Sequence, residues 1–141
     1  MQFEIIVADD PPPAEREVIL DALRAYNESH SGPANYGTWA VLLRDAQSSE
    51  TIGGLWALSA HNWFRIDLLF IPEQLRGEGL GTRLVRQAEA IARERGHIGI
   101  WLNTFEAPGF YQKLGYEVFG VLPDHPGGRR RFFLHKRLQQ A

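Results

Sequence analysis

Gly77, Gly79 and Gly81 alternate with other residues between an apolar run and a helical pattern, in the segment LLFIPEQLRGEGLGTRLV. Glycine adopts positive φ and lets a ligand approach the main chain closely. The first N–H groups of a helix lack intrahelical partners and carry a partial positive charge. An apolar strand, a glycine loop and a helix in this order therefore predict an anion site that suits phosphates.

Two common phosphate loops fit this segment poorly. A Walker P-loop needs a lysine after its last glycine, but Thr82 follows Gly81 and no lysine precedes Lys113. A dinucleotide-binding loop reads G-x-G-x-x-G in a tight strand–helix turn, whereas this loop reads G-x-G-x-G and begins several residues after the strand. A nucleotide-binding domain remains an alternative hypothesis, as does a loop that only turns the chain.

Two motifs in chain order point to one family. The first is R-x-x-G-x-G at Arg76, Gly79 and Gly81. The second lies in IWLNTFEAPGFYQKLGYEVFG, with Ala107, Phe110, Tyr111, Lys113, Gly115 and Tyr116 at its key positions. Both resemble motifs of the GNAT superfamily of acyl-coenzyme A-dependent N-acetyltransferases, whose small bacterial members have a similar layout. The resemblance covers residues 63–138, and residues 1–60 match only in coarse layout.

The resemblance implies an acyltransferase that moves an acetyl group from acetyl-coenzyme A to a primary amine of a small molecule or peptide, by direct attack in a ternary complex. In this family the loop amides hold the pyrophosphate, and pantetheine bonds to the strand before the loop. The implied cofactor-binding residues are Leu69, Phe70, Ile71, Arg76, Gly77, Glu78, Gly79, Leu80, Gly81, Thr82, Asn103 and Phe110. Arg83 or Arg86 is expected to meet the remaining phosphate.

Tyr111 is the candidate general acid, a role that the resemblance assigns to this position. Coenzyme A leaves as a thiolate, and thiols of this kind have a pKa near ~8.5, so the leaving group benefits from a proton at neutral pH. A phenol with a pKa near ~10 can donate that proton as the thiolate forms. The alternative is a packed aromatic ring whose hydroxyl caps a backbone group.

Asp67 is the first candidate for a base that takes a proton from the attacking amine, and Glu106 is the second. The alternation of the strand from Trp63 predicts that Phe64, Ile66, Leu68 and Phe70 share one face, with Arg65, Asp67 and Leu69 on the other. Many family members keep an acidic residue on the equivalent strand. The alternative for Asp67 is a salt bridge with Arg65 or another arginine.

The elements that must position these residues follow from periodicity and turn signals. Helices are predicted from Pro12 or Pro13 to an end between Asn27 and Gly32, from residue 80 to a stop at Gly96, and over residues 108–114. Strands are predicted over residues 3–8, 39–43, 51–60, 63–71, 98–103, 116–121 and 131–138. We expect one α+β domain over residues 1–141, with a mixed, mostly antiparallel sheet of about seven strands. The resemblance adds a splayed V between the two central strands.

Composition limits the remaining functions. The chain has no cysteine, which excludes disulfides, thiolate zinc sites and a cysteine nucleophile. The absence also fits a reducing compartment, so we expect a cytoplasmic protein. A net charge of −2 argues against general nucleic-acid binding, and no run approaches the ~20 apolar residues of a membrane span. The five histidines show no paired metal spacing, so no metal is expected, and His61 is a candidate near the active site.

The acceptor amine is poorly specified by the sequence. Candidate acceptor contacts are Tyr26, Asn35, Tyr36, Trp39, Trp56, Trp63 and the loop of residues 124–130. A small amine, an aminoglycoside-like drug, a polyamine, a peptide N-terminus and a protein lysine all stay open. A homodimer is plausible from the resemblance alone. A non-catalytic acyl-coenzyme A sensor is the alternative function.

Overall fold

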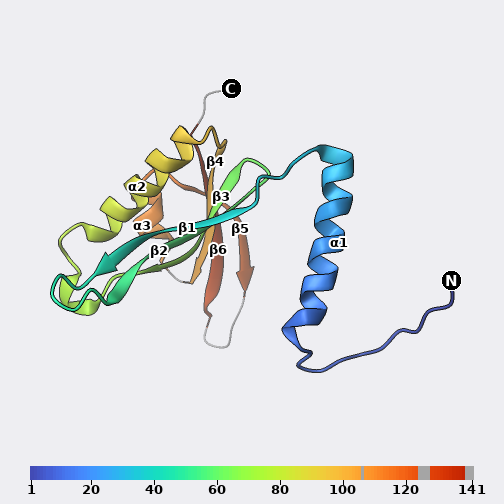
Figure 1. Ribbon diagram of the computed structural model, residues 1–141. Coiled ribbons are helices and arrows are strands. Elements are labelled where there is room, and N and C mark those ends of the chain that lie inside the picture. Colours follow the sequence, from blue (N-terminus) through green and yellow to red (C-terminus); the bar gives the residue numbers. More distant parts are fainter. Residues whose placement is uncertain (106, 124–127, 139–141) are drawn as a thin grey trace. The chain divides into compact units, whose positions relative to one another are not determined.

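The computed structural model describes residues 1–105, 107–123 and 128–138 (Figure 1). The chain divides into two compact units, Met1–Ala34 and Asn35–Ala141. The expectation of one domain over the whole chain stays a prediction. In the described parts, no helix is both long and apolar enough to cross a membrane.

The N-terminal unit contains one helix, α1 (Pro13–Ser31). Proline is tolerated in the first turn because its missing N–H has no partner there. The helix ends where Gly32 adopts a φ of 78° and its N–H donates to the carbonyl of Glu28 at 3.0 Å. This start and end agree with the sequence prediction.

The predicted strand over residues 3–8 is wrong, because these residues form no strand and are all exposed. Their β-branched side chains favour extended backbone, but a strand is stable only when a neighbouring strand pairs with it. No strand of the described residues pairs with this segment.

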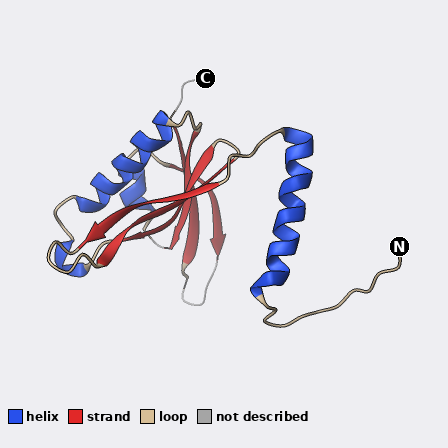
Figure 2. Cartoon of the chain, in the orientation of Figure 1, coloured by secondary structure: helices blue, strands red, loops and turns tan. Residues whose placement is uncertain are grey.

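The second unit is a six-stranded sheet with helices packed against it (Figure 2). The strands are β1 (Gly37–Arg44), β2 (Thr51–Ala60), β3 (Trp63–Phe70), β4 (Gly99–Phe105), β5 (Glu117–Pro123) and β6 (Arg130–Arg137). Their order in the sheet is β1-β2-β3-β4-β6-β5. Only β3 and β4 pair in parallel, and the other neighbours are antiparallel. The α+β class and the mixed, mostly antiparallel sheet are therefore confirmed, with six strands in the described residues rather than about seven.

Helix α2 (Leu80–Glu94) and helix α3 (Pro108–Lys113) share one core with the sheet (Figure 1). The apolar face of α2 repeats at helical spacing and buries Leu84, Val85, Ala88 and Ala92. From the sheet the core receives Leu55, Ala57, Phe64, Ile66, Ile100, Leu102 and Leu134. A short 3₁₀ turn, η1 (Glu73–Leu75), follows β3.

The central strands β3 and β4 separate after four residue pairs. Trp63–Ile66 pairs with Gly99–Leu102, and the rest of each strand continues without pairing to the other. The remainder of β4 pairs only with β6 on its other side. The two strands therefore open into the splayed V that the resemblance implied.

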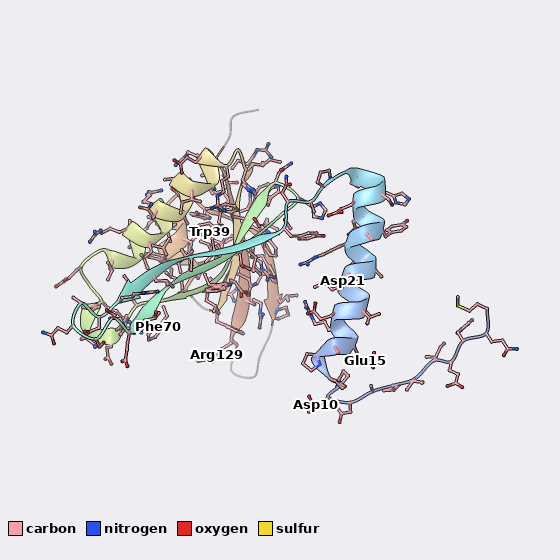
Figure 3. The ribbon with its side chains drawn as sticks, viewed as in Figure 1. Asp10, Glu15, Asp21, Trp39, Phe70 and Arg129 are labelled. Carbon is pink, nitrogen blue, oxygen red and sulfur yellow. The ribbon has the colours of Figure 1, made fainter. Side chains whose placement is uncertain are left out.

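A β-bulge at Asp67 interrupts β3. Trp56 of β2 pairs with Leu68, while the next residue of β2 pairs with Ile66, so Asp67 is an extra residue. An extra residue reverses the faces that follow it. Leu68 and Phe70 are accordingly 63% and 54% exposed, and Leu69 packs against the core. Phe70 is labelled in Figure 3. The predicted alternation is therefore wrong beyond Ile66.

Candidate functional site

The loop between η1 and α2 has free space beside its main chain at two glycines. Gly77 and Gly79 adopt φ values of 88° and 78°, which side-chain-bearing residues rarely adopt. Gly79 is the N-cap of α2, and no side chain caps this helix. A Cβ added at either glycine would meet no heavy atom of the protein within 4 Å. The first turn of α2 thus begins without a cap and beside open space, as an anion site requires.

A cavity of about 270 Å³ lies at this loop. Its lining comes from the segment after β3, η1, the loop, the first turn of α2 and α3: Ile71, Leu75, Arg76, Gly77, Gly79, Leu80, Gly81, Thr82 and Phe110. The structure therefore brings most of the predicted cofactor-binding residues together. Leu69, Phe70, Glu78 and Asn103 lie outside this lining, and the cofactor-binding role of every predicted residue stays a prediction.

The side chain of Arg76 connects the loop to Phe70, the last residue of β3, and to Ile71, which follows it. Its Nε donates to the carbonyl oxygen of Ile71 at 2.8 Å, and its guanidinium lies 5.6 Å from the centre of the Phe70 ring. The contact with Phe70 is a cation–π interaction. The arginine of the R-x-x-G-x-G motif thus shapes the loop, while the glycines leave room for a ligand.

Gly81 lets α3 approach the first turn of α2. A Cβ at this position would lie 3.2 Å from Cζ of Phe110, closer than ordinary van der Waals contact. Phe110 therefore packs over α2 because residue 81 has no side chain. The ring of Tyr111 lies edge-on to that of Phe110, with centroids 4.9 Å apart.

Tyr111 is buried in α3 and follows Phe110, which lines the loop cavity. Its carbonyl accepts hydrogen bonds from the N–H groups of Leu114 at 3.0 Å and Tyr116 at 3.1 Å. Burial raises the pKa of the Tyr111 hydroxyl to about 12, because the phenolate would lose its hydration. The phenol is therefore protonated at neutral pH, as a proton donor must be.

Asp67 projects from the bulge and forms the salt bridge that was its alternative. Nη2 of Arg65 lies 3.5 Å from Oδ1 of Asp67, and the aspartate side chain is 40% exposed. The guanidinium of Arg65 also lies 5.5 Å from the centre of the Trp101 ring. A half-exposed pair of this kind is weak, so the base role of Asp67 stays a prediction. Glu106 lies outside the described residues.

Of the two arginines expected to meet a phosphate, Arg86 is engaged elsewhere. Its Nη1 donates to Oε1 of Glu89 at 2.9 Å. Glu89 is 1% exposed, and the sequence analysis missed it. A signal was available, because Glu89 lies four residues after Val85 and three before Ala92, on the buried face of α2.

The aromatic residues named as acceptor contacts fall into different environments. Trp39 packs in the core against Phe64, with ring centroids 4.7 Å apart. Trp56 lines a mainly apolar cavity of about 380 Å³ with Leu68 and Phe70. A further hollow of about 680 Å³ is lined by Ala60, His61, Trp63, Trp101, Phe119, Phe133 and His135. His61 and Trp63 therefore lie together, away from the loop cavity's lining.

The described ranges contain no group of three or more His, Cys, Asp or Glu side chains that could hold a metal ion.

Comparison with known proteins gives a family match and close relatives. Residues 35–118 match the model of the acetyltransferase (GNAT) domain. The chain is 40% identical over 128 residues to blasticidin-S acetyltransferase of Streptomyces morookaense, covering 88% of this chain and 91% of the relative. Both matches include the glycine loop and the central strands.

Solved structures share the architecture. The crystal structure of an acetyltransferase from Agrobacterium tumefaciens superposes with a TM-score of 0.89 at 28% identity, covering 96% of this chain and 99% of the other. An aminoglycoside 6′-N-acetyltransferase solved in complex with coenzyme A has a TM-score of 0.64 at 23% identity, covering 95% and 96%. The second similarity shows the fold alone.

Proposed function

Because the chain belongs to the GNAT acetyltransferase family, we propose that it transfers the acetyl group of acetyl-coenzyme A to a primary amine of a small molecule. The observation that carries the proposal is the uncapped first turn of α2 at Gly77 and Gly79, with Tyr111 buried against Phe110, which lines the loop cavity. The first feature suits a diphosphate and the second a proton donor.

Binding in this proposal relies mainly on backbone groups. The N–H groups around residues 77–82 donate to the diphosphate, where charge-assisted hydrogen bonds are stronger than neutral ones. The end of β3 that does not pair with β4, from Asp67 to Phe70, borders the opening of the V and supplies backbone groups to pantetheine. One of these N–H groups would polarise the thioester carbonyl, as an oxyanion hole does.

In the chemical step the amine nitrogen attacks the thioester carbonyl carbon and forms the C–N bond. The C–S bond then breaks, and the departing sulfur takes the proton of the Tyr111 hydroxyl. The amine must lose a proton, and Asp67 is the candidate to receive it directly or through water. Its carboxylate is 40% exposed and would have to serve while paired with Arg65.

For the acceptor, we propose a small molecule that combines an amine with an apolar or planar portion. The named relative acts on blasticidin-S, and it aligns with 88% of this chain. The cavity lined by Trp56, Leu68 and Phe70 offers aromatic and aliphatic surface next to the bulge at Asp67. A peptide is the alternative acceptor. A cytoplasmic location and a homodimer are further parts of the proposal, the first from the absence of cysteine and the second from the family resemblance.

The test combines binding with turnover. The purified chain is titrated with coenzyme A by calorimetry, and thiol release from acetyl-coenzyme A is then followed over a panel of amines. We expect saturable binding and amine-dependent thiol release. Tyr111→Phe should lower kcat by about 10²-fold or more with little change in KM, since its proton is needed in the transition state.

Three other results of these assays would favour a different function or overturn the proposal. Binding of coenzyme A without acetylation of any amine would favour the sensor function. Binding of ATP or NAD that acetyl-coenzyme A does not displace would favour a nucleotide-binding domain. An absence of any affinity for coenzyme A would overturn the proposal.

A further inference from the structure

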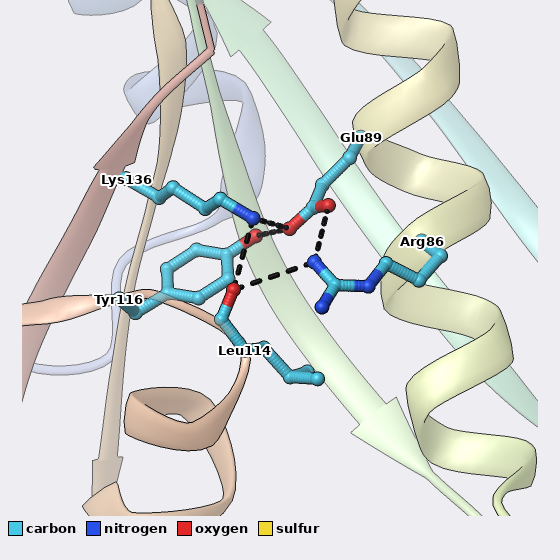
Figure 4. Close-up of polar contacts among 5 residues, drawn as sticks. All are labelled: Arg86, Glu89, Leu114, Tyr116 and Lys136. Atoms are coloured by element: carbon cyan, nitrogen blue, oxygen red, sulfur yellow. Dashed lines mark hydrogen bonds and ion pairs between the residues drawn. The ribbon is translucent and has the colours of Figure 1, made fainter.

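A buried carboxylate on α2 connects three elements that are distant in sequence (Figure 4). Oε2 of Glu89 accepts a hydrogen bond from the hydroxyl of Tyr116 at 2.9 Å and one from Nζ of Lys136 at 3.1 Å. Oε1 accepts from Nη1 of Arg86 at 2.9 Å. The donors come from α2, from the segment after α3 and from β6.

Glu89 is ionised in this setting. Burial opposes the charged form, but the hydrogen bonds from Arg86, Lys136 and Tyr116 outweigh it and hold the pKa of Glu89 below its ordinary value. Burial and the neighbouring carboxylate raise the pKa of Tyr116, so its hydroxyl remains a donor. A buried charge cluster is weak evidence for stability, since apolar packing often serves as well. A role in fixing one local arrangement explains it better.

The same two cations also hold the end of α3. Nζ of Lys136 donates to the carbonyl oxygen of Leu114 at 2.9 Å, and Nη1 of Arg86 donates to it at 3.3 Å. Leu114 is the C-cap of α3, where carbonyl groups lack helical partners. Glu89 keeps both cations in place because its carboxylate lies between them (Figure 4).

The cluster around Glu89 is connected to Tyr111 by backbone hydrogen bonds and by a contact between aromatic rings. The N–H groups of Leu114 and Tyr116 both donate to the carbonyl oxygen of Tyr111. The ring of Tyr116, held by its hydroxyl on Glu89, lies edge-on to the ring of Tyr111 with centroids 5.9 Å apart. The cluster therefore constrains both the backbone and the ring of Tyr111.

Helix α3 needs such support. It has six residues, begins with Pro108 and continues with Gly109. A helix of this length is not stable alone, and glycine disfavours helix. Its orientation must therefore come from tertiary contacts.

We propose that Glu89 is a positioning residue for the acetyl transfer, which holds α3 so that the Tyr111 hydroxyl points at the departing sulfur. This inference rests on the proposed function, in which Tyr111 donates the proton. Glu89 itself touches neither substrate, so its effect on the chemistry should pass through Tyr111.

A double-mutant cycle tests that claim. Glu89→Gln keeps the shape of the side chain but removes the charge that holds Arg86 and Lys136. We expect it to lower kcat about tenfold or more, with KM for acetyl-coenzyme A within about twofold because the glycine loop is untouched. In the Tyr111→Phe background the same change should leave kcat within about twofold, because the group that it positions is already absent.

The matched control is Ala92→Gly, a buried change on the same helix. Glycine weakens the helix, so this variant should lower Tm without changing kcat. If Glu89→Gln lowers kcat equally in both backgrounds, or not at all, the positioning role is overturned. Should Glu89→Gln fail to fold, Tyr116→Phe replaces it in the cycle, since it removes only the hydroxyl that donates to Glu89.

A readout independent of turnover separates this inference from the proposed function. The chain has four tyrosines, so ring signals of ¹³C-labelled tyrosine can be assigned with Tyr111→Phe. Glu89→Gln should shift the Tyr111 signal and Ala92→Gly should not. An unchanged Tyr111 signal in Glu89→Gln overturns the positioning role. A shifted signal combined with a Tyr111→Phe enzyme of full kcat overturns the acid role of Tyr111 instead.

Discussion

Replacing Gly79 with alanine separates backbone strain from ligand binding at the loop. Gly79 adopts a φ of 78° as the N-cap of α2, and a Cβ there would meet nothing within 4 Å. The added methyl group therefore causes no clash in the free protein. It does force an L-residue into the left-handed region, which costs roughly 1–2 kcal/mol.

The expected loss of affinity is larger than the loss of stability. The methyl group would stand where a diphosphate approaches the main chain, and one charge-assisted hydrogen bond to an N–H group contributes about 1.5–3 kcal/mol. Losing one such bond weakens the affinity for coenzyme A by about 10- to 150-fold. The unfolding midpoint should fall by about 4 °C for each kcal/mol of strain.

Gly96→Ala is the matched control. Gly96 follows the other end of α2, adopts a φ of 72° and also has no atom within 4 Å of an added Cβ. Both variants should lose similar stability in thermal unfolding, but only Gly79→Ala should lose affinity in calorimetric titration with coenzyme A. Equal affinities for coenzyme A in the two variants would refute the assignment of the loop.

Three other predictions concern pH and packing. Because the pKa of Tyr111 is raised to about 12, the alkaline limb of the kcat–pH profile should show no loss from its ionisation up to about pH 10, and a fall near pH 8.5 that disappears in Tyr111→Phe would contradict the raised pKa. Burial lowers the pKa of the His97 imidazole. The contribution of neutral His97 to stability is therefore complete above about pH 6.5, where this imidazole is neutral in the unfolded chain too, and it is lost as the pH falls below that value. Urea unfolding of His97→Gln should therefore depend less on pH between about 7 and 5 than that of the wild type, and parallel curves would contradict this reasoning. A Cβ at Gly99 would overlap the carbonyl oxygen of Lys136 and lie 2.8 Å from Cζ3 of Trp63, so Gly99→Ala should lower the free energy of unfolding by about 1–3 kcal/mol, and an unchanged urea midpoint would show that the strands can move apart.

Elements whose signal lies within one segment of the sequence were predicted correctly. The helix of residues 80–94, the glycine loop before it and the hairpin partners around residues 51–70 are each coded in one continuous segment. The strand predicted over residues 3–8 failed because β-propensity says nothing about whether a partner strand exists. The bulge at Asp67 was missed because an extra residue is defined by pairing with β2, which alternation within β3 cannot reveal.

In the candidate site too, features with a local sequence signal were predicted and features that depend on tertiary contacts were not. The open glycines and the position of Tyr111 followed from motif spacing. The brace that Arg76 makes to Ile71 and the cluster around Glu89 did not, because they depend on which groups the fold brings together. Lys136 lies far along the chain from Glu89, so only the tertiary structure shows that this buried carboxylate has partners.

The short pairing of β3 with β4 divides the sheet into two halves, and we call this pairing the seam. On one side β1, β2 and β3 form a meander of hairpins between chain neighbours, and on the other β5 and β6 form a hairpin that also borders β4. The seam itself joins distant parts of the chain through only four residue pairs. Since contacts between distant residues carry the larger loop-closure entropy, the β1–β2–β3 meander and the β5–β6 hairpin should form early, and β4, whose partners in β3 and β6 are both distant in sequence, should pair last during folding. The opening between β3 and β4, where we propose that the thioester binds, would then be the final part of the sheet to take shape.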